Sequence, residues 1–516
     1  MFKPLLRAAA PVLLLLTAPL AAQQAPMQAG VRIGAQPGPP ITPADLLRHI
    51  EILASDGFQG RAPGTEGERL TINYIAEQWR RRGLEPAGES GSWFQPVRIV
   101  ERRPERYQAR WTARGAAVEM PAGDIVVMGK EARETVTDAP VVFAGHGVRL
   151  PERGVDQLAG ANIEGAVVLI LLQGPSVPGF PSVAERMRTV NAAGAIAVIA
   201  IVGDDVPWEA VSGTIGRGTT RLDETSVPRI TGVMPMAAAQ RLVAAAGGDM
   251  GRLLNDQPGS SFRAVTLAAR VSIEATTSVV RYTSNNVVGR LRGGGATGQS
   301  LLLLGHWDHF GTCRPEGEGD RICNGAVDNA SGIATLIEVA GRLSAGPRPA
   351  RDMLFLATTS EEVGLLGAEY FASHPVVPLD SIVAAVNLDT VALAPAGEPV
   401  AILNRDIPGL AALVETTATA MGRRMDNARE ADSMVERQDG FALARHGVAA
   451  FMVGGSFASM ARLNAFLSGR YHGPDDEADG TIELNGAAED ADLLVALSRR
   501  LADPQVWRRP LGSDDE

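Results

Sequence analysis

The stretch Leu301-Leu302-Leu303-Leu304-Gly305-His306-Trp307-Asp308 decides the fold of this chain. Its four leucines and the glycine that follows are typical of a short strand buried on both faces. His306 and Asp308 lie two residues apart where this strand ends, so an extended backbone would turn both side chains to the same side. Asp308 is then placed to orient the His306 imidazole, although a buried and satisfied histidine explains these two residues alone equally well.

Four later stretches also put polar side chains at the ends of predicted elements. They hold Asp328 before a helix over 330–345, Glu361 and Glu362 after a strand over 352–358, Asp389 after a strand over 382–388, and Tyr471-His472-Gly473-Pro474-Asp475. Taken singly, an acidic residue beside a helix is more often a cap or a partner of the helix dipole. Together, the five stretches supply two imidazoles, three carboxylates suited to metal and one spare carboxylate. That is the inventory of a metal-assisted hydrolase.

The order of predicted elements indicates the fold class. Strands are predicted over 285–291, 301–304, 352–358 and 382–388, and helices over 43–55, 69–83, 330–345, 363–373 and 487–501. Strands that alternate with helices predict an α/β sheet with helices on both faces. The polar residues would then lie at the carboxyl ends of strands, where such sheets place their sites.

In this order, the stretches resemble the co-catalytic zinc peptidases, which include bacterial leucyl aminopeptidases and the glutamate carboxypeptidase II group. The resemblance extends over most of the chain after residue 41. It includes the stretch Leu53-Ala54-Ser55-Asp56-Gly57-Phe58-Gln59-Gly60-Arg61-Ala62-Pro63-Gly64-Thr65. It implies a mixed β-sheet sandwiched by helices, two zinc ions per chain, and removal of the N-terminal residues of peptide substrates.

The resemblance also implies a role for each polar residue. The residues that correspond to the family's ligands are, for one zinc, His306, Asp328 and Asp389, and, for the other, Asp328, Glu362 and His472. Glu361 would be the general base and later the acid that protonates the leaving amine, with Asp308 beside it as a further catalytic residue. A cis peptide bond is expected between Asp328 and Asn329.

Three positions depart from the family pattern. Gln438 precedes Asp439 where many members have serine, Ala449 stands where many have proline, and Thr390 replaces a common methionine. Because the ligand set is intact, we expect these departures to affect the choice of substrate. Asp439 and Tyr471 are the predicted substrate-binding residues.

Composition fits a globular enzyme of two domains. The chain has 516 residues, too many for one ordinary domain, with 45% hydrophobic and 21% charged residues. Its net charge of −11 argues against a nucleic-acid-binding protein, which would need a basic face.

The ends of the chain predict export. A positively charged start followed by an apolar stretch up to Ala22 predicts a signal peptide over 1–22, too short to span a membrane. There is no cysteine nearby to accept a lipid, so we expect a periplasmic or secreted protein without a membrane anchor. Residues 23–40, rich in Gln, Gly and Pro, predict a flexible leader, and residues 506–516 an acidic tail.

The middle of the chain looks inserted. Residues 116–268 resemble a protease-associated domain, a β-rich module, and would divide the catalytic domain into 41–115 and 269–505. The insertion contains no predicted metal cluster, and His146 is interpreted as a turn residue. Its expected task is to shape or cover the site.

Cys313 and Cys323 flank one polar loop between two predicted ligands. Export favours a disulfide between them, and closing so short a loop stabilises a fold by roughly 2–3 kcal/mol on the chain-entropy model. The alternative is a metal-binding pair, but the spacing resembles no zinc ribbon.

Three other functions stay open. A carboxypeptidase of the same family would need a cationic pocket, for which Arg437 and Arg470 are candidates. A glutaminyl-cyclase-like transferase would use one zinc, and a non-catalytic binding protein would be expected to have lost ligands. Zinc is favoured by the mixture of histidine and carboxylate, although cobalt or manganese would fit the same donors. These patterns do not predict side-chain preference or oligomeric state.

Overall fold

The computed structural model describes residues 38–175, 177, 179–255 and 262–510. The predicted signal peptide, most of the predicted leader and the end of the predicted tail lie outside the described residues. Within the described part, no helix is long and apolar enough to cross a membrane.

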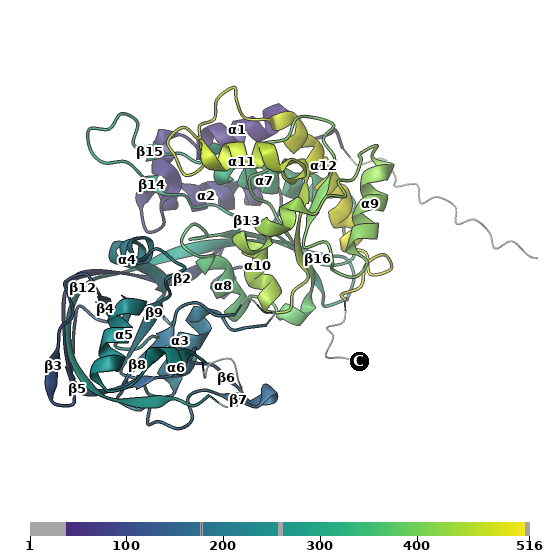
Figure 1. Cartoon of the computed structure of the whole chain (residues 1–516). Coiled ribbons are helices and arrows are strands. Elements are labelled where there is room, and N and C mark those ends of the chain that lie inside the picture. Colours follow the sequence, from purple (N-terminus) through teal and green to yellow (C-terminus); the bar gives the residue numbers. More distant parts are fainter. Residues whose placement is uncertain (1–37, 176, 178, 256–261, 511–516) are drawn as a thin grey trace, which may run out of the picture. The chain divides into compact units, whose positions relative to one another are not determined.

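One mixed sheet runs through the structure (Figure 1). Its strands meet in the order β18 (Ala401–Leu403), β19 (Ala450–Gly454), β17 (Ile382–Asn387), β13 (Ser300–His306), β16 (Asp352–Thr358), β12 (Val265–Leu291), β5 (Arg133–Phe143), β8 (Val167–Leu171), β9 (Ala197–Val202), β11 (Ile230–Pro235) and β4 (Val126–Gly129). β13 pairs in parallel with β16 and β17, and β17 pairs in parallel with β19. The carboxyl ends of these four strands therefore meet at one edge of the sheet.

Helices cover both faces around β13. Leu301 and Leu303 pack into a core with α1 (Pro43–Leu53), α2 (Glu66–Arg81), α7 (Ser331–Ala345) and α12 (Leu484–Leu501). Leu302 and Leu304 belong to a second core with α8 (Leu366–Ser373) and α10 (Asp439–Arg445). Successive leucines thus point to opposite, equally buried faces. The predicted α/β sheet with helices on both faces is confirmed.

The helix limits differ from the predicted ones by up to three residues, and for the starts of two helices the local cause is clear. α2 begins at Glu66, earlier than predicted, because the Thr65 hydroxyl caps it by accepting the backbone N–H of Glu68. α8 begins later than predicted because the chain first makes a turn, in which the Leu365 N–H donates to the Glu361 carbonyl at 2.9 Å. This turn separates the two adjacent glutamates from the helix.

A second region contains two layers of helices around the other half of the sheet. Its helices are α3 (Val183–Ala192), α4 (Trp208–Arg217), α5 (Met236–Ala245) and α6 (Met250–Asn255). Val167 and Leu169 of β8 face the core that contains α5 and α6 residues, whereas Val168 and Ile170 face the core that contains α3 and α4 residues. Its resemblance to a protease-associated domain stays a prediction.

Long paired strands join the two regions. β2 (Phe94–Ala113) pairs with β12 along most of its length, and β12 continues until it pairs with β16. Trp111 and Ile273 lie in the same core as β8. This core therefore extends beyond the predicted limits of 116 and 268 on both sides.

Candidate metal centre

The predicted ligands gather at the carboxyl edge of the central strands. His306 is the last residue of β13, the pair Glu361 and Glu362 follows β16, and Asp389 follows β17. The side chain of His306 is only 2% exposed, that of Glu362 4% and that of Asp389 14%. The strand ends bring these groups together although they are far apart in the sequence.

Asp328 lies at the centre of this cluster, in the turn that precedes α7. Its Oδ1 atom is 3.2 Å from Nε2 of His306, and its Oδ2 atom is 3.4 Å from Nε2 of His472. The carboxylate therefore presents one oxygen to each imidazole. Two ligands of a tetrahedral zinc ion with bonds near 2.0–2.1 Å lie roughly 3.3 Å apart, so both separations suit a shared metal ligand.

Two further contacts complete the predicted sets. Nε2 of His306 is 3.6 Å from Oδ1 of Asp389, and Nε2 of His472 is 2.9 Å from Oε2 of Glu362. Oε2 of Glu361 lies 4.0 Å from His306 Nε2. Glu361 thus borders the cluster from the side of His306 and Asp389.

The donors fit a divalent cation. Oδ2 of Asp328 and Nε2 of His472 are buried without a hydrogen-bond partner among the described residues, and both belong to the cluster. Several carboxylates in one buried volume are unfavourable unless positive charge balances them. Imidazole and carboxylate donors in this number are the combination that suits zinc.

The close packing of carboxylates and imidazoles in the cluster shifts the pKa values of its members. Burial raises the pKa of Glu361 well above its ordinary value, against the opposing charge of His306. Burial alone would lower the pKa of His472, but the neighbouring carboxylates of Asp328 and Glu362 raise it to about 9. Burial would raise the pKa of Asp328, yet the two imidazoles hold it well below the usual range.

Asp308 contacts the His306 ring, as predicted, and its backbone carbonyl is the nearer group. Nδ1 of His306 is 3.2 Å from the backbone carbonyl oxygen of Asp308 but 3.8 Å from its Oδ1 atom. β13 ends at His306, so Asp308 lies beyond the extended segment. Oδ1 of Asp308 instead accepts the backbone N–H of Glu361 at 3.1 Å. Burial raises the pKa of Asp308 to about 7.

His309 is a site residue that the sequence reasoning missed. Its Nδ1 atom makes a hydrogen bond with Oε1 of Glu362, and its ring is buried. Glu362 therefore has an imidazole on each oxygen, from His309 and His472. The only sequence signal was a second histidine three positions after His306.

Asp476 is a second missed residue. Its buried carboxylate accepts the backbone N–H groups of Val327 and Asp328, each at 3.0 Å. Burial raises the pKa of Asp476 to about 6. The peptide bond between Asp328 and Asn329 is cis, as the resemblance predicted. Asp476 thus fixes the backbone that carries the central carboxylate.

Arg61 ties the N-terminal stretch to the site. Its buried guanidinium donates to the backbone carbonyls of Leu53 and Trp307 at 2.8 Å, Asn324 at 2.5 Å and Gly325 at 2.9 Å. The loops that flank His306 and Asp328 are therefore held by one side chain.

The two predicted substrate residues lie beside the cluster. The ring of Tyr471 stacks on that of His472 with centroids 3.5 Å apart, and burial raises the pKa of Tyr471 above its ordinary range. Asp439 is buried and accepts the hydroxyl of Thr358 at the end of β16. Their part in substrate binding stays a prediction.

Other predicted groups are also accounted for. Cys313 and Cys323 form the predicted disulfide. Arg470 is engaged by its own loop, where Nε donates to the carbonyl of Asp475 at 2.7 Å and Nη2 to that of Glu477 at 3.1 Å. Arg437 is exposed. Of the two arginines predicted to bind a terminal carboxylate, Arg470 is therefore occupied and only Arg437 is exposed.

The carboxyl-terminal half of the chain matches a known protein family. Residues 286–497 match the sequence model of peptidase family M28. This segment belongs to peptidase family M28. All five predicted metal ligands lie within the matched segment.

Individual proteins match stretches of different length. A vacuolar membrane protease of Candida dubliniensis is 34% identical over 107 residues, which are 20% of this chain and 10% of that relative. A probable lipoprotein aminopeptidase of Mycobacterium tuberculosis is 24% identical over 359 residues, which are 67% of this chain and 58% of the relative. The chain thus spans about a tenth of the length of the first relative. An aminopeptidase from Aneurinibacillus sp. strain AM-1 shares the fold, with a TM-score of 0.50 and 17% identity over 91% of this chain and 94% of that one.

Proposed function

We propose that this M28 metallopeptidase is an exported aminopeptidase that uses two zinc ions. The observation that carries the proposal is the position of Asp328, whose two oxygens lie 3.2 Å and 3.4 Å from the imidazoles of His306 and His472. One carboxylate between two imidazoles is what a pair of metals with a shared ligand requires.

Each metal has its own donors. His306 and Asp389 would hold one zinc with Asp328, and Glu362 and His472 would hold the other with Asp328. When bound, the zinc ions lower the pKa of a water to about 7 and polarise the scissile carbonyl.

Glu361 is the proton carrier of the proposed reaction. It accepts the proton of the attacking water and then delivers it to the nitrogen of the leaving amine. Its backbone is held by Asp308, and its carboxylate lies 4.0 Å from His306. Because burial raises the pKa of Glu361, the residue keeps a proton readily enough to return it.

The charge around the centre favours a substrate with a free amino terminus. The charges of Asp389 and His306 act on both Glu361 and Asp439, so these groups lie close together. Asp439 and Glu361 lie outside the proposed zinc ligand sets, and a positively charged ammonium group suits their carboxylates. The engagement of Arg470 by its own loop also argues against a carboxypeptidase.

The test compares two sets of substrates. Aminoacyl-anilides with a free amino group and peptides with a blocked amino end and free carboxylate are each incubated with the protein, with added zinc and with chelator. We expect chelator-sensitive cleavage of the first set only. Glu361→Gln should lower kcat by roughly 10²–10⁴-fold while two zinc ions stay bound, and the exposed Glu415→Gln should behave like the wild type.

Other results would reject specific parts of the proposal. Cleavage of the blocked set alone would make the protein a carboxypeptidase, and release of cyclised product without hydrolysis would favour a transferase. One zinc per active chain would contradict the shared role of Asp328. Fractionation of cells that express the full chain tests export, and retention in the cytoplasm with an uncleaved start would contradict it.

A further inference from the structure

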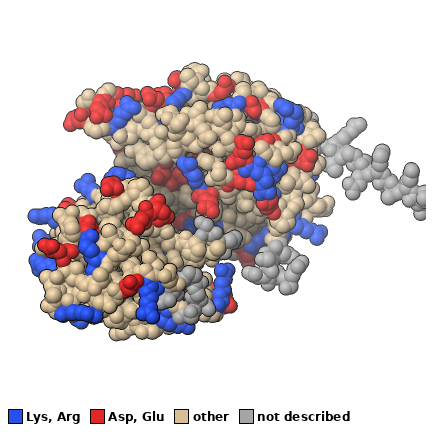
Figure 2. All heavy atoms as spheres, viewed as in Figure 1, with Lys and Arg blue, Asp and Glu red and all other residues tan. Residues whose placement is uncertain are grey.

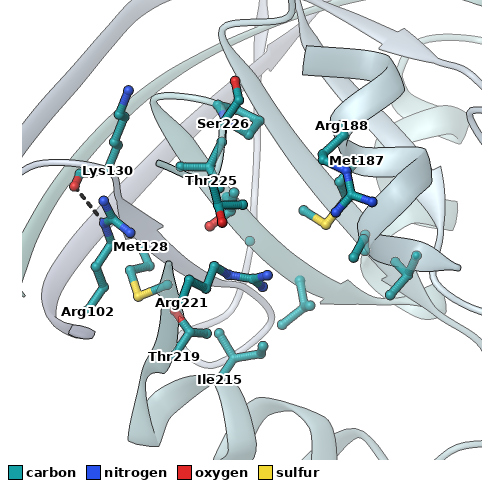
Figure 3. A pocket seen from close by; sticks show the side chains of 18 of the residues that line it. Arg102, Met128, Lys130, Met187, Arg188, Ile215, Thr219, Arg221, Thr225 and Ser226 are labelled. Carbon is teal, nitrogen blue, oxygen red and sulfur yellow. Dashed lines mark hydrogen bonds between the residues drawn. The ribbon is translucent and has the colours of Figure 1, made fainter. Parts of the chain in front are cut away.

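A cavity lies in the second region of the fold, among β2, β4, α3, α4, β10 (Thr219–Leu222) and β11. Its volume is about 150 Å³. Apolar side chains form much of its wall, including Met128, Met187, Ile215 and Val233. Figure 3 shows Met128, Met187 and Ile215 around the space, on different elements.

Four cationic residues also line this cavity, namely Arg102, Lys130, Arg188 and Arg221, and no aspartate or glutamate does. Figure 3 shows the guanidinium groups of Arg188 and Arg221 directed into the space. Neither group makes a hydrogen bond or an ion pair with any described residue. Burial and the charge of Arg188 lower the pKa of Arg221, so its positive charge is poorly compensated.

The carboxylates that interact electrostatically with Arg102 and Arg188 have other bonding partners. Glu131 and Asp223 both bind Arg281, at 2.9 Å and 3.1 Å. Glu185 is the reciprocal partner of Ser182 in the cap of α3. Acidic and basic residues lie side by side on the visible surface (Figure 2). Among the described residues that line the cavity, in contrast, all charged ones are basic.

We propose that this cavity binds a carboxylate carried on a compact apolar group. The carboxylate would take the free donors of Arg188 and Arg221, and the apolar group would lie against Met128, Met187 and Ile215. An arginine fork matches a carboxylate in shape and charge, and an apolar wall with a few placed polar groups is typical of small-ligand sites.

The cavity's size restricts the apolar group. A dry cavity of about 150 Å³ accepts a group of the size of a benzene ring, so a leucine-sized or phenylalanine-sized side chain fits and a long acyl chain does not fit entirely within it. Two sources of this chemistry are a peptide that ends in an apolar residue and a short fatty acid. The cavity is separate from the carboxylate-rich metal centre, since it shares no lining residue with it.

The experiment measures binding by titration calorimetry on the full chain in the presence of chelator, so that no hydrolysis occurs. The probes are acetyl-alanyl-leucine with a free carboxylate, its amide, and octanoate. We expect the free acid to bind at least tenfold more tightly than the amide. Binding of the peptide but not octanoate identifies a peptide terminus, and the reverse identifies a fatty acid.

Variants test the assigned residues. Arg188→Gln together with Arg221→Gln should weaken binding of the acid at least tenfold, and Arg188→Gln alone, at an exposed position, should weaken it severalfold without affecting the fold. Arg252→Gln, exposed on α6 in the same region, is the matched control and should leave binding unchanged. Equal binding of acid and amide, binding that survives in the double variant, or no binding of either acid would overturn the proposal.

Discussion

The carboxylate of Asp476 accepts a hydrogen bond from the backbone N–H of Asp328 at 3.0 Å. A buried acid that takes no direct part in the ligand cluster thereby fixes the residue at its centre. The proposed centre thus depends on a group outside the ligand set. The effect of Asp476 on metal binding can therefore be tested without changing a ligand.

Asp476→Ala should weaken zinc binding by about 10–100-fold, the usual effect of removing a residue that orients a ligand. Asp476→Asn, which keeps one acceptor oxygen, should weaken zinc binding less than Asp476→Ala does. Zinc affinity is measured by competition with a chromophoric chelator. The exposed neighbour Asp475→Asn is the control, and equal affinity in D476A and D475N would contradict the assigned role.

His472→Ala should reduce the zinc content from two ions per chain to one. The reason is that His472 is itself a ligand in only one of the two proposed sets, beside Glu362 and the shared Asp328. Native mass spectrometry gives the stoichiometry directly. His446→Ala, at a surface position, should keep both ions. Loss of both ions in H472A would mean that the two sites do not fill separately.

Arg61→Gln should lower the free energy of unfolding by about 3 kcal/mol or more, because it leaves several buried carbonyls without their charged donor. Urea denaturation followed by circular dichroism measures the change. Arg69→Gln, whose guanidinium pairs with Glu66 on the surface of α2, should have little effect. Similar stability of R61Q and R69Q would show that water replaces the guanidinium.

Replacing both Cys313 and Cys323 by serine should lower the free energy of unfolding by roughly 2–3 kcal/mol on the chain-entropy model. The disulfide closes a segment with a sequence separation of 10 residues. Denaturation of the variant is compared with that of the oxidised wild type. If the reduced wild type matches the oxidised protein in stability, the crosslink has no stabilising role.

His146 predicts acid sensitivity of the second region. Burial and the charge of Arg186 lower the pKa of His146 below its ordinary value of 6.5. The folded state therefore favours the neutral ring, and its stabilising effect is present above pH 6.5 and decreases as the pH falls through the lowered pKa. Between pH 7.5 and 5, the Tm of the wild type should fall further than that of His146→Gln. If the Tm of the wild type and that of His146→Gln fell equally with pH, the prediction would be contradicted. His446→Gln is the control and should follow the wild type.

The carboxyl ends of the central strands could be predicted from the sequence because a change from apolar to polar residues indicates each of them. The leucine run before His306 and the apolar run before Glu361 both stop at polar residues, so strand limits and candidate ligands come from the same few positions. The disulfide was equally local, since two cysteines flank one loop.

Contacts between distant segments could not be predicted in this way. His309 meets Glu362, 53 residues away, and Asp476 meets Asp328, 148 residues away. Nothing near Asp476 distinguishes it from its exposed neighbour Asp475. The sequence predicted that Asp308 contacts His306, but it did not predict that the backbone carbonyl would be nearer to the ring than the carboxylate.

The 27 residues of β12 have a practical meaning for protein engineering. Val271 near one end of this strand packs in the core of the second region, and Val287 near the other end packs beside α2 and α7. A chimera that exchanges the second region with another peptidase must therefore be joined in the middle of β2 and β12, at residues that pair with each other in the sheet. Cutting at the turns would remove a strand from one of the two cores.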